Sequence, residues 1–292
     1  MPMSSYLNNH SVKLYYWNEK KNFGDFLSPY LITKITNLKV QHVDSHYYGK
    51  LVAIGSLLRY QTLFTKSHIW GTGSLTRDFQ HKIPIFNIKR QIHNLYRSYC
   101  CKSTIHALRG PLSADICLKA GFEVPQIYAD PAVLLPSFYK PKMKDQNKKV
   151  GLVLHHSQMN LISNNWLDRF RFIDIARQSS EEIEDFIDEI VSCDFVFSSS
   201  LHGIVVAQAY GIPAQWITIR NIPIHKDETF KFHDYFLGVN QIVQEPLCID
   251  ISTNELQKYS LSIIPPKIRM AEFDHARQRL LDSFPDVSMI SI

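Results

Sequence analysis

A run of short polar residues that ends in a histidine, Ser198–His202, is the stretch of the chain best suited to chemistry. It follows the β-rich run Phe195–Phe197 and precedes an apolar run that Gly211 and Pro213 bring to an end. The predicted order is therefore strand, polar turn, short helix and strand. In an open α/β sheet, ligands bind at the carboxyl ends of strands, against the N-termini of helices. His202 could donate or accept a proton there near neutral pH. The segment alone equally permits serines that only cap a helix and a structural histidine.

Charged and polar residues also follow other predicted strands. Arg109 lies between a β-rich run and a predicted helix, and Arg220 follows the predicted strand 214–219. A guanidinium at such a place could bind a phosphate or a carboxylate in a bidentate fork, or it could be an ordinary surface residue. Asn22 and Asp25 lie in a glycine-containing turn whose backbone N–H groups suit an anion or a sugar hydroxyl. A role as helix N-cap would explain Asp25 as well.

Strands alternate with helices along the whole chain. Predicted strands span residues 12–17, 51–54, 68–70, 105–108, 150–154, 170–175, 195–197 and 214–219, and predicted helices span residues 26–35, 112–120, 181–192, 231–236 and 267–284. This alternation indicates an α/β fold with parallel sheets that helices cover on both faces. The charged segment 140–149 is typical of a linker, so we expect two domains, 1–140 and 141–265, that face each other across a cleft. Residues 266–292 would form a C-terminal helix that packs back on the first domain.

The composition indicates which cellular compartment and which classes of partner we expect for this chain. A net charge of +5 suits an anionic small molecule or an acidic membrane surface and is too weak to indicate a nucleic acid. The five cysteines are odd in number and lack the spacing of metal ligands, so we expect no metal site and free, mostly buried thiols in a reducing cytoplasm. The N-terminus lacks the order of a signal peptide, and no apolar run reaches the roughly 18–20 residues of a membrane span.

Seven motifs together carry a resemblance to a known family. They are NFGDFLSPYL (22–31), WGTGS (70–74), ALRGPLS (107–113), YADPAVLLP (128–136), VGLVLHH (150–156), SSSLHGIVVAQAYGIPA (198–214) and KFHDYF (231–236). By their order and spacing, the chain resembles the polysaccharide pyruvyltransferase family over most of residues 12–238. The resemblance implies two Rossmann-like domains around a central cleft, similar to GT-B glycosyltransferases, with the first domain on the acceptor side and the second on the donor side.

The resemblance also implies a reaction. Pyruvate would pass from phosphoenolpyruvate to a sugar of a bacterial surface polysaccharide, such as an exopolysaccharide or capsule, as a ketal with release of phosphate. No metal and no organic cofactor are implied. The methylene carbon of the donor must be protonated before a sugar hydroxyl attacks, and His202 matches the family's histidine. The donor carries a phosphate and a carboxylate, so we expect Arg109, Arg220 and Lys231 around it, with Lys231 the weakest match.

The turn before His202 departs from the family's pattern. Many members carry an arginine two residues before the histidine, where this chain has Ser200. Because Ser200 cannot neutralise a phosphate, Arg220 or Arg109 must contribute more of the positive charge, or the donor binds differently. Ser199 and Ser200 are still expected to contact the donor.

Short polar residues on the opposite wall are expected to bind the acceptor. They are Asn22, Asp25, Ser74, His156 and Asp130. Each also has an ordinary capping or turn role, and the surrounding motifs favour Asp25 and His156. The implied acceptor is a glycan or a lipid-linked sugar, which would bring a cytoplasmic protein into peripheral contact with the inner face of the membrane.

Two other functions stay open at the level of sequence. A nucleotide-sugar-dependent glycosyltransferase would share the fold, but Glu181 and Glu182 begin a solvated helix and do not form the spaced acidic pair of such enzymes. A non-catalytic glycan-binding protein would explain the missing arginine, but not His202 with its basic companions. The sequence leaves the acceptor sugar, the hydroxyl pair and the oligomeric state undetermined.

Overall fold

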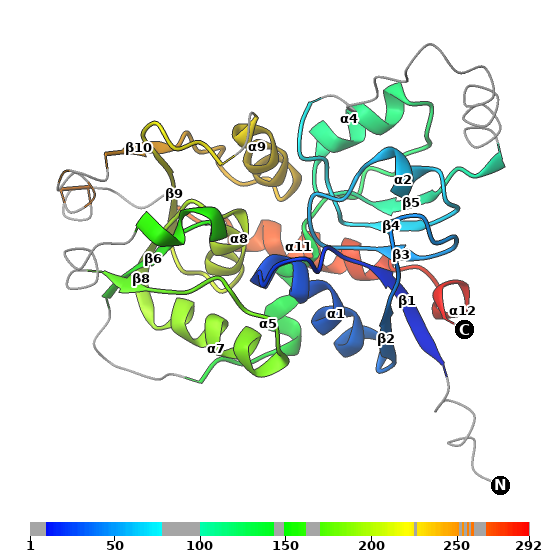
Figure 1. The fold of residues 1–292 in the computed structure, drawn as a ribbon, viewed down its shortest axis with the longest axis horizontal. Coiled ribbons are helices and arrows are strands. Elements are labelled where there is room, and N and C mark those ends of the chain that lie inside the picture. Colours follow the sequence, from blue (N-terminus) through cyan, green and yellow to red (C-terminus); the bar gives the residue numbers. More distant parts are fainter. Residues whose placement is uncertain are drawn as a thin grey trace, which may run out of the picture.

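The protein folds into two lobes, each built around one β-sheet (Figure 1). The computed structural model describes residues 10–77, 100–142, 149–161, 170–224, 227–250 and 267–291, together with residues 253, 256, 258 and 259. We call the part around strands β1–β5 the first lobe and the part around strands β6–β10 the second lobe.

Both sheets are parallel and share one strand order. The first contains β2 (Lys39–His42), β1 (Ser11–Tyr15), β3 (Leu51–Val52), β4 (His68–Trp70) and β5 (Thr104–Ala107), in that spatial order. The second contains β7 (Arg171–Phe172), β6 (Lys149–Val153), β8 (Cys193–Ser198), β9 (Ala214–Ile219) and β10 (Leu247–Ile249). In each sheet the earliest strand of the chain lies between the next two. The strand order therefore reverses beside β1 and beside β6, and ligands bind at such reversals in parallel sheets.

Helices follow the strands in both lobes. They are α1 (Phe23–Thr36), α2 (Tyr60–Leu63) and α4 (Pro111–Lys119) in the first lobe, the connecting η3 (Pro131–Leu134) and α5 (Leu135–Phe138), and η4 (His156–Leu161), α7 (Ser180–Val191), α8 (Leu201–Ala209) and α9 (Glu228–Gly238) in the second lobe. The fold is thus α/β with parallel sheets, as the alternation predicted.

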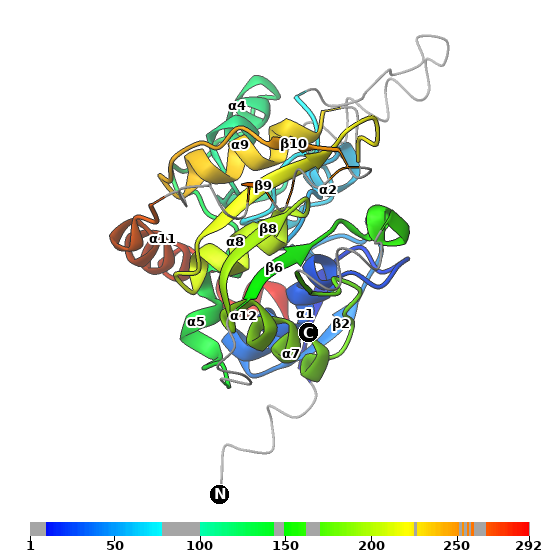
Figure 2. The ribbon, with the colours of Figure 1, turned by 90° about the vertical axis from the view of Figure 1, so that its left-hand side faces the viewer.

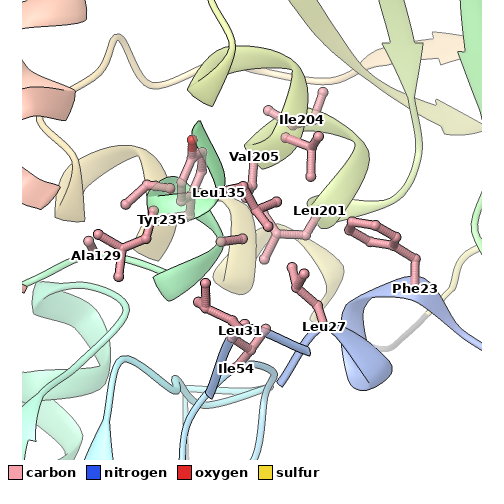
Figure 3. Packing of buried hydrophobic residues seen from close by; sticks show 14 of the residues in the cluster. Phe23, Leu27, Leu31, Ile54, Ala129, Leu135, Leu201, Ile204, Val205 and Tyr235 are labelled. Atoms are coloured by element: carbon pink, nitrogen blue, oxygen red, sulfur yellow. The ribbon is translucent and has the colours of Figure 1, made fainter. Parts of the chain in front are cut away.

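One cluster of buried hydrophobic residues continues from the first lobe into the second. Figure 3 shows side chains of α1, of α8 and of the 129–135 segment packed against one another. The Phe23 ring stacks on Phe186 of α7 with 4.2 Å between centroids, and the Phe23 N–H donates to the carbonyl of Ile175 at 2.8 Å. The first turn of α1 is therefore held against the second lobe, although its preceding strand belongs to the first.

The C-terminal helices contact both lobes. They are α11 (Met270–Asp282) and α12 (Val287–Ile290), and Figure 2 shows α11 on the flank of the molecule beside α8. Trp70 of β4 donates its indole N–H to the carbonyl of Leu280 at 3.0 Å. Arg277 donates to the carbonyls of Val133, at 2.8 Å, and Ala209, at 2.6 Å. The end of the chain therefore helps to fix the two sheets relative to one another.

Several predicted elements have different bounds in the structure. Helix α1 begins at Phe23 and not at residue 26, so Asn22 is the N-cap residue and Asp25 lies in the first turn. Helix α9 extends beyond residues 231–236 and is buried over most of its length, because it packs against α4 of the first lobe. The edge strands β2 and β10 were not predicted, since the residues of β2 are largely exposed and lack apolar alternation. Residues 143–148 of the predicted linker lie outside the described residues.

The thiols match the expectation from composition. All five cysteines are free, and Cys101, Cys117 and Cys193 are buried. Burial raises the pKa of the Cys117 thiol to about 12, so this sulfur is inert as a nucleophile. None of the described helices has the length and apolar character needed to span a bilayer.

Candidate active site

A pocket lies where the carboxyl ends of the two sheets face each other. Its lining comes from the loops after β1, β3, β4, β5, β6 and β8 and from α9. The lining residues are Trp17, Asn22, Asp25, Gly55, Ser56, Leu57, Arg59, Leu75, Arg109, His155, His156, Ser200, Leu201, His202 and Lys231. The pocket therefore lies at the strand-order reversal of both sheets at once, where a ligand is expected.

His202 lines this pocket from the first turn of α8, two residues after the N-cap residue Ser200. Its side chain is 12% exposed, and Nε2 lies 3.7 Å from Oδ2 of Asp130. Burial lowers the pKa of the imidazole; Asp130 opposes this shift, and the charges of Lys231 and Arg109 add to it. The imidazole of the free protein is therefore biased towards its neutral form.

Gly24, in the first turn of α1, makes room for the histidine ring. A Cβ atom at this position would lie 2.1 Å from Nδ1 of His202, so only glycine allows the ring its observed place. The closeness brings the positive end of the α1 dipole to the imidazole, which also favours the neutral ring.

Arg109 is completely buried and largely committed to the protein. Its Nε donates to Oδ2 of Asp234 at 3.1 Å, Nη1 to the Ser56 hydroxyl at 2.9 Å, and Nη2 to the Ser74 carbonyl at 2.5 Å. Asp234 also accepts the backbone N–H of Ser113 at 2.9 Å. Arg109 therefore supplies positive potential to the pocket while its fork is used inside the protein, and it binds the two lobes together.

Lys231 is a buried pocket cation with uncommitted hydrogen-bonding capacity. It is 6% exposed on α9 and lines the pocket, and within the described ranges its ammonium has no hydrogen bond or ion pair, only the Phe232 ring at 5.4 Å. Burial lowers the pKa of Lys231 to about 8; Arg109 adds to this shift, and Glu228 and Asp25 oppose it. An anionic ligand would restore the favourable surroundings that this ammonium lacks.

Asp25 lies across the pocket on the first turn of α1. It accepts a hydrogen bond from Nδ2 of Asn22 at 2.5 Å. Burial raises the pKa of the Asp25 carboxyl to about 6, against the opposing effects of the Asn22 hydrogen bond and the Lys231 charge. A carboxyl in this range can accept a proton from a bound hydroxyl near neutral pH.

An aromatic wall closes the pocket beside β6. The His156 ring packs on His155 with 4.1 Å between centroids, and Trp17 lies at 6.3 Å from His156. Burial lowers the pKa of His156, and the charges of Lys20 and Lys231 act in the same direction. Nδ1 of His156 is buried without a hydrogen-bond partner in the described part of the chain. A flat apolar face beside a polar atom of this kind suits one face of a sugar ring.

The pocket brings together seven of the residues singled out from the sequence. These are Asn22, Asp25, Arg109, His156, Ser200, His202 and Lys231. Asp130 lies buried behind His202.

Three other predicted residues are not among the pocket-lining residues. Ser74 holds Arg109 through its carbonyl. Ser199 donates its hydroxyl to Gln158 Oε1 at 2.7 Å. Arg220 is exposed at the end of β9, where its N–H donates to the carbonyl of Ile249 at 2.9 Å.

Sequence reasoning missed several lining residues and one supporting residue. Trp17 ends a predicted strand, and Ser56 and His155 each follow one, so the strand-end argument that selected Arg109 could have found them. Asp234 lies in the KFHDYF motif, but nothing local indicates that it pairs with Arg109. Across the described ranges, no group of three or more His, Cys, Asp or Glu side chains is arranged to hold a metal ion.

Comparison with known proteins adds a family match. A family model described as polysaccharide pyruvyl transferase matches residues 3–221. The chain is also 24% identical over 261 residues to uncharacterized protein L143 of Acanthamoeba polyphaga mimivirus, which covers 86% of this chain and 83% of that protein. The family match contains every pocket-lining residue except Lys231, which lies beyond its end.

Proposed function

The chain belongs to the polysaccharide pyruvyl transferase family, and we propose that it transfers pyruvate from phosphoenolpyruvate to two hydroxyls of one sugar, forming a ketal and releasing phosphate. Family membership implies a transferase that moves a pyruvyl group to a polysaccharide. The donor, the ketal product and an acceptor that is a surface glycan or its lipid-linked precursor belong to the proposal. The two parallel sheets of equal strand order are compatible with the two Rossmann-like domains of a GT-B fold.

The observation that carries the proposal is an uncommitted, buried ammonium beside a histidine in one pocket. Lys231 and His202 reach the pocket from α9 and α8, and Arg109 adds a second positive charge behind them. Phosphoenolpyruvate carries a phosphate and a carboxylate on the same carbon, C2, so it would neutralise both cations. Its negative charge would also raise the pKa of His202 and so favour the imidazolium.

The proposed reaction assigns a proton transfer to each side of the pocket. His202 gives a proton to the methylene carbon, which becomes the methyl group, and C2 becomes an oxocarbenium carbon. A sugar hydroxyl bonds to C2 and passes its proton to the Asp25 carboxylate. The C2–O bond to phosphate then breaks, the second hydroxyl bonds to C2, and its proton leaves with the phosphate. Phosphoenolpyruvate and the sugar are thus converted to the ketal and inorganic phosphate without an oxidant or a reductant.

Product analysis tests this proposal. The protein is incubated with phosphoenolpyruvate and a panel of synthetic and lipid-linked sugars, and phosphate release and the mass of the acceptor are followed. We expect both signals in the wild type and their loss in His202→Ala, whereas His46→Ala, which changes an exposed histidine outside the pocket lining, should retain them. Turnover of nucleotide sugars with no reaction of phosphoenolpyruvate would contradict the proposal. Normal turnover by His202→Ala would remove this residue as the acid.

A further inference from the structure

Two buried polar atoms face each other behind the pocket without a hydrogen bond. Oδ2 of Asp130 and Nε2 of His202 are 3.7 Å apart, and neither atom has a hydrogen-bond partner among the described residues. Asp130 is completely buried, and its other oxygen accepts the N–H of Ala132 at 3.0 Å. A buried carboxylate oxygen without a donor is costly, so its presence opposite an imidazole nitrogen requires an explanation.

The backbone holds this carboxylate in place. Asp130 is the N-cap residue of η3, and the preceding Ala129 N–H donates to the carbonyl of Leu108 at 3.0 Å. Helix α8 packs directly on η3. The carboxylate of Asp130 and the ring of His202 therefore lie on two elements that pack against each other, and the 3.7 Å between Oδ2 and Nε2 exceeds a usual N–H···O distance of about 2.9–3.0 Å by less than 1 Å.

The other charged groups around the ring do not favour an imidazolium. Lys231 on α9 and Arg109 after β5 both disfavour it. Asp25 on α1 is the next carboxylate of the pocket, and it hydrogen-bonds Asn22. Asp130 is the carboxylate that acts on His202 in the favourable direction.

We propose that Asp130 is a positioning residue that accepts the Nε2–H of His202 and so makes Nδ1 the nitrogen that exchanges a proton with the ligand. Nε2 is enclosed in the protein, whereas His202 lines the pocket with Nδ1 beside the backbone of Gly24. When the imidazolium forms, the Asp130 carboxylate stabilises it. The role of this proton in catalysis rests on the proposed function, whereas the pair itself is a property of the free protein.

Histidine NMR of the free protein tests the pair without any substrate. In the ¹⁵N-histidine-labelled wild type, we expect the neutral His202 ring to carry its proton on Nε2. Asp130→Asn keeps an oxygen that can cap Ala132 but removes the charge. We expect the pKa of His202 in this variant to fall by about one unit or more, with a shift towards the Nδ1–H tautomer. Asp115→Asn, at an exposed carboxylate, should leave both unchanged.

Two results would overturn the pair. One is a wild-type His202 whose neutral form carries its proton on Nδ1, a measurement that does not depend on the folding of any variant. The other is a folded Asp130→Asn protein with an unchanged pKa and tautomer of His202.

Kinetics separates this inference from the proposed function. In the pyruvyl-transfer assay, Asp130→Asn should move the alkaline limb of the kcat profile to lower pH. A fall of one pKa unit reduces the imidazolium fraction about tenfold above that limb. If no pyruvyl transfer occurs with any acceptor but the NMR shifts do, the proposed function fails and the pair stands. If transfer occurs and neither the NMR nor the profile responds, the pair fails and the proposed function stands.

Discussion

Replacing Asp234 should weaken the contact between the two lobes and lower the free energy of unfolding. Its carboxylate accepts hydrogen bonds from Nε of Arg109 at 3.1 Å, and from the N–H, at 2.9 Å, and the hydroxyl, at 2.6 Å, of Ser113. The N-cap residue of α4 is Gly110, which has no side chain of its own to cap the helix. A residue of the second lobe therefore both caps a helix of the first lobe and neutralises its buried arginine.

The expected magnitude follows from the burial of the pair. Both side chains are 0% exposed, and removing one partner of a buried ion pair costs about 3–5 kcal/mol because the other charge is left uncompensated. Losing a helix cap alone costs about 1 kcal/mol, and we include it in that range because the same carboxylate makes both interactions. Asp234→Ala should therefore lower the free energy of unfolding by about 3–5 kcal/mol. Asp234→Asn, which keeps one acceptor oxygen, should lower it by less.

Urea unfolding followed by circular dichroism measures this loss. The matched control is Asp115→Ala, which breaks the exposed pair with Lys119 on α4 and should change the free energy of unfolding by no more than about 0.5 kcal/mol. If Asp234→Ala loses no more stability than Asp115→Ala, the reasoning about the buried pair is wrong.

Three further predictions concern the pocket. Lys231→Met should raise the KM for phosphoenolpyruvate about 10- to 100-fold, the loss expected for one charge-assisted hydrogen bond. Steady-state kinetics checks this, with Lys119→Met as the exposed control. A KM of Lys231→Met equal to that of the wild type would refute the role of Lys231 in binding the donor. Gly24→Ala places a methyl group 2.1 Å from Nδ1 of His202, so kcat should fall about 100-fold or more, while urea unfolding shows a change of about 1–3 kcal/mol; an active variant would show that the ring position is unimportant. Asp25→Asn should stabilise the free protein above pH 6 by up to about 3 kcal/mol, because burial raises the pKa of Asp25 from 3.8 to about 6 and folding therefore opposes ionisation of this carboxyl. Urea unfolding at several pH values should show that this gain in the free energy of unfolding shrinks as the pH falls below 6 and vanishes near pH 4. A gain that does not depend on pH would contradict this prediction.

Short-range patterns in the sequence predict much of the fold. Buried strands such as β4 and β9 consist mainly of apolar residues of types that favour β-strands. Gly211 follows the end of α8 and has a positive φ of 77°, which suits glycine. These signals lie within a few residues of the element they define. Edge strand β2 lacks them, because a mostly exposed edge needs no apolar pattern.

The candidate site was predictable to the extent that it follows strand ends. His202, Arg109 and Asp25 were found because parallel strands bring their carboxyl ends to one edge. The use of each side chain was not predictable. Arg109 was expected to offer its fork to a ligand; it lines the pocket, but three of its N–H groups donate inside the protein, to Asp234, Ser56 and Ser74. Asp234 lies 125 positions away in the chain. Lys231, the weakest match in the sequence, is the buried pocket cation whose ammonium has no hydrogen bond or ion pair among the described residues.

The sequence by itself therefore determined the α/β class, the positions of most elements and the set of residues from which a site could be built. Those properties depend on apolar periodicity and on turn residues, which act over a few positions. Only the tertiary structure decided that Gly24 admits the ring of His202, that Asp130 faces Nε2, and that Arg109 holds the lobes together. These properties depend on which side chains contact each other across the two lobes. Each buried polar contact affects stability because leaving a polar group unpaired inside a protein costs free energy.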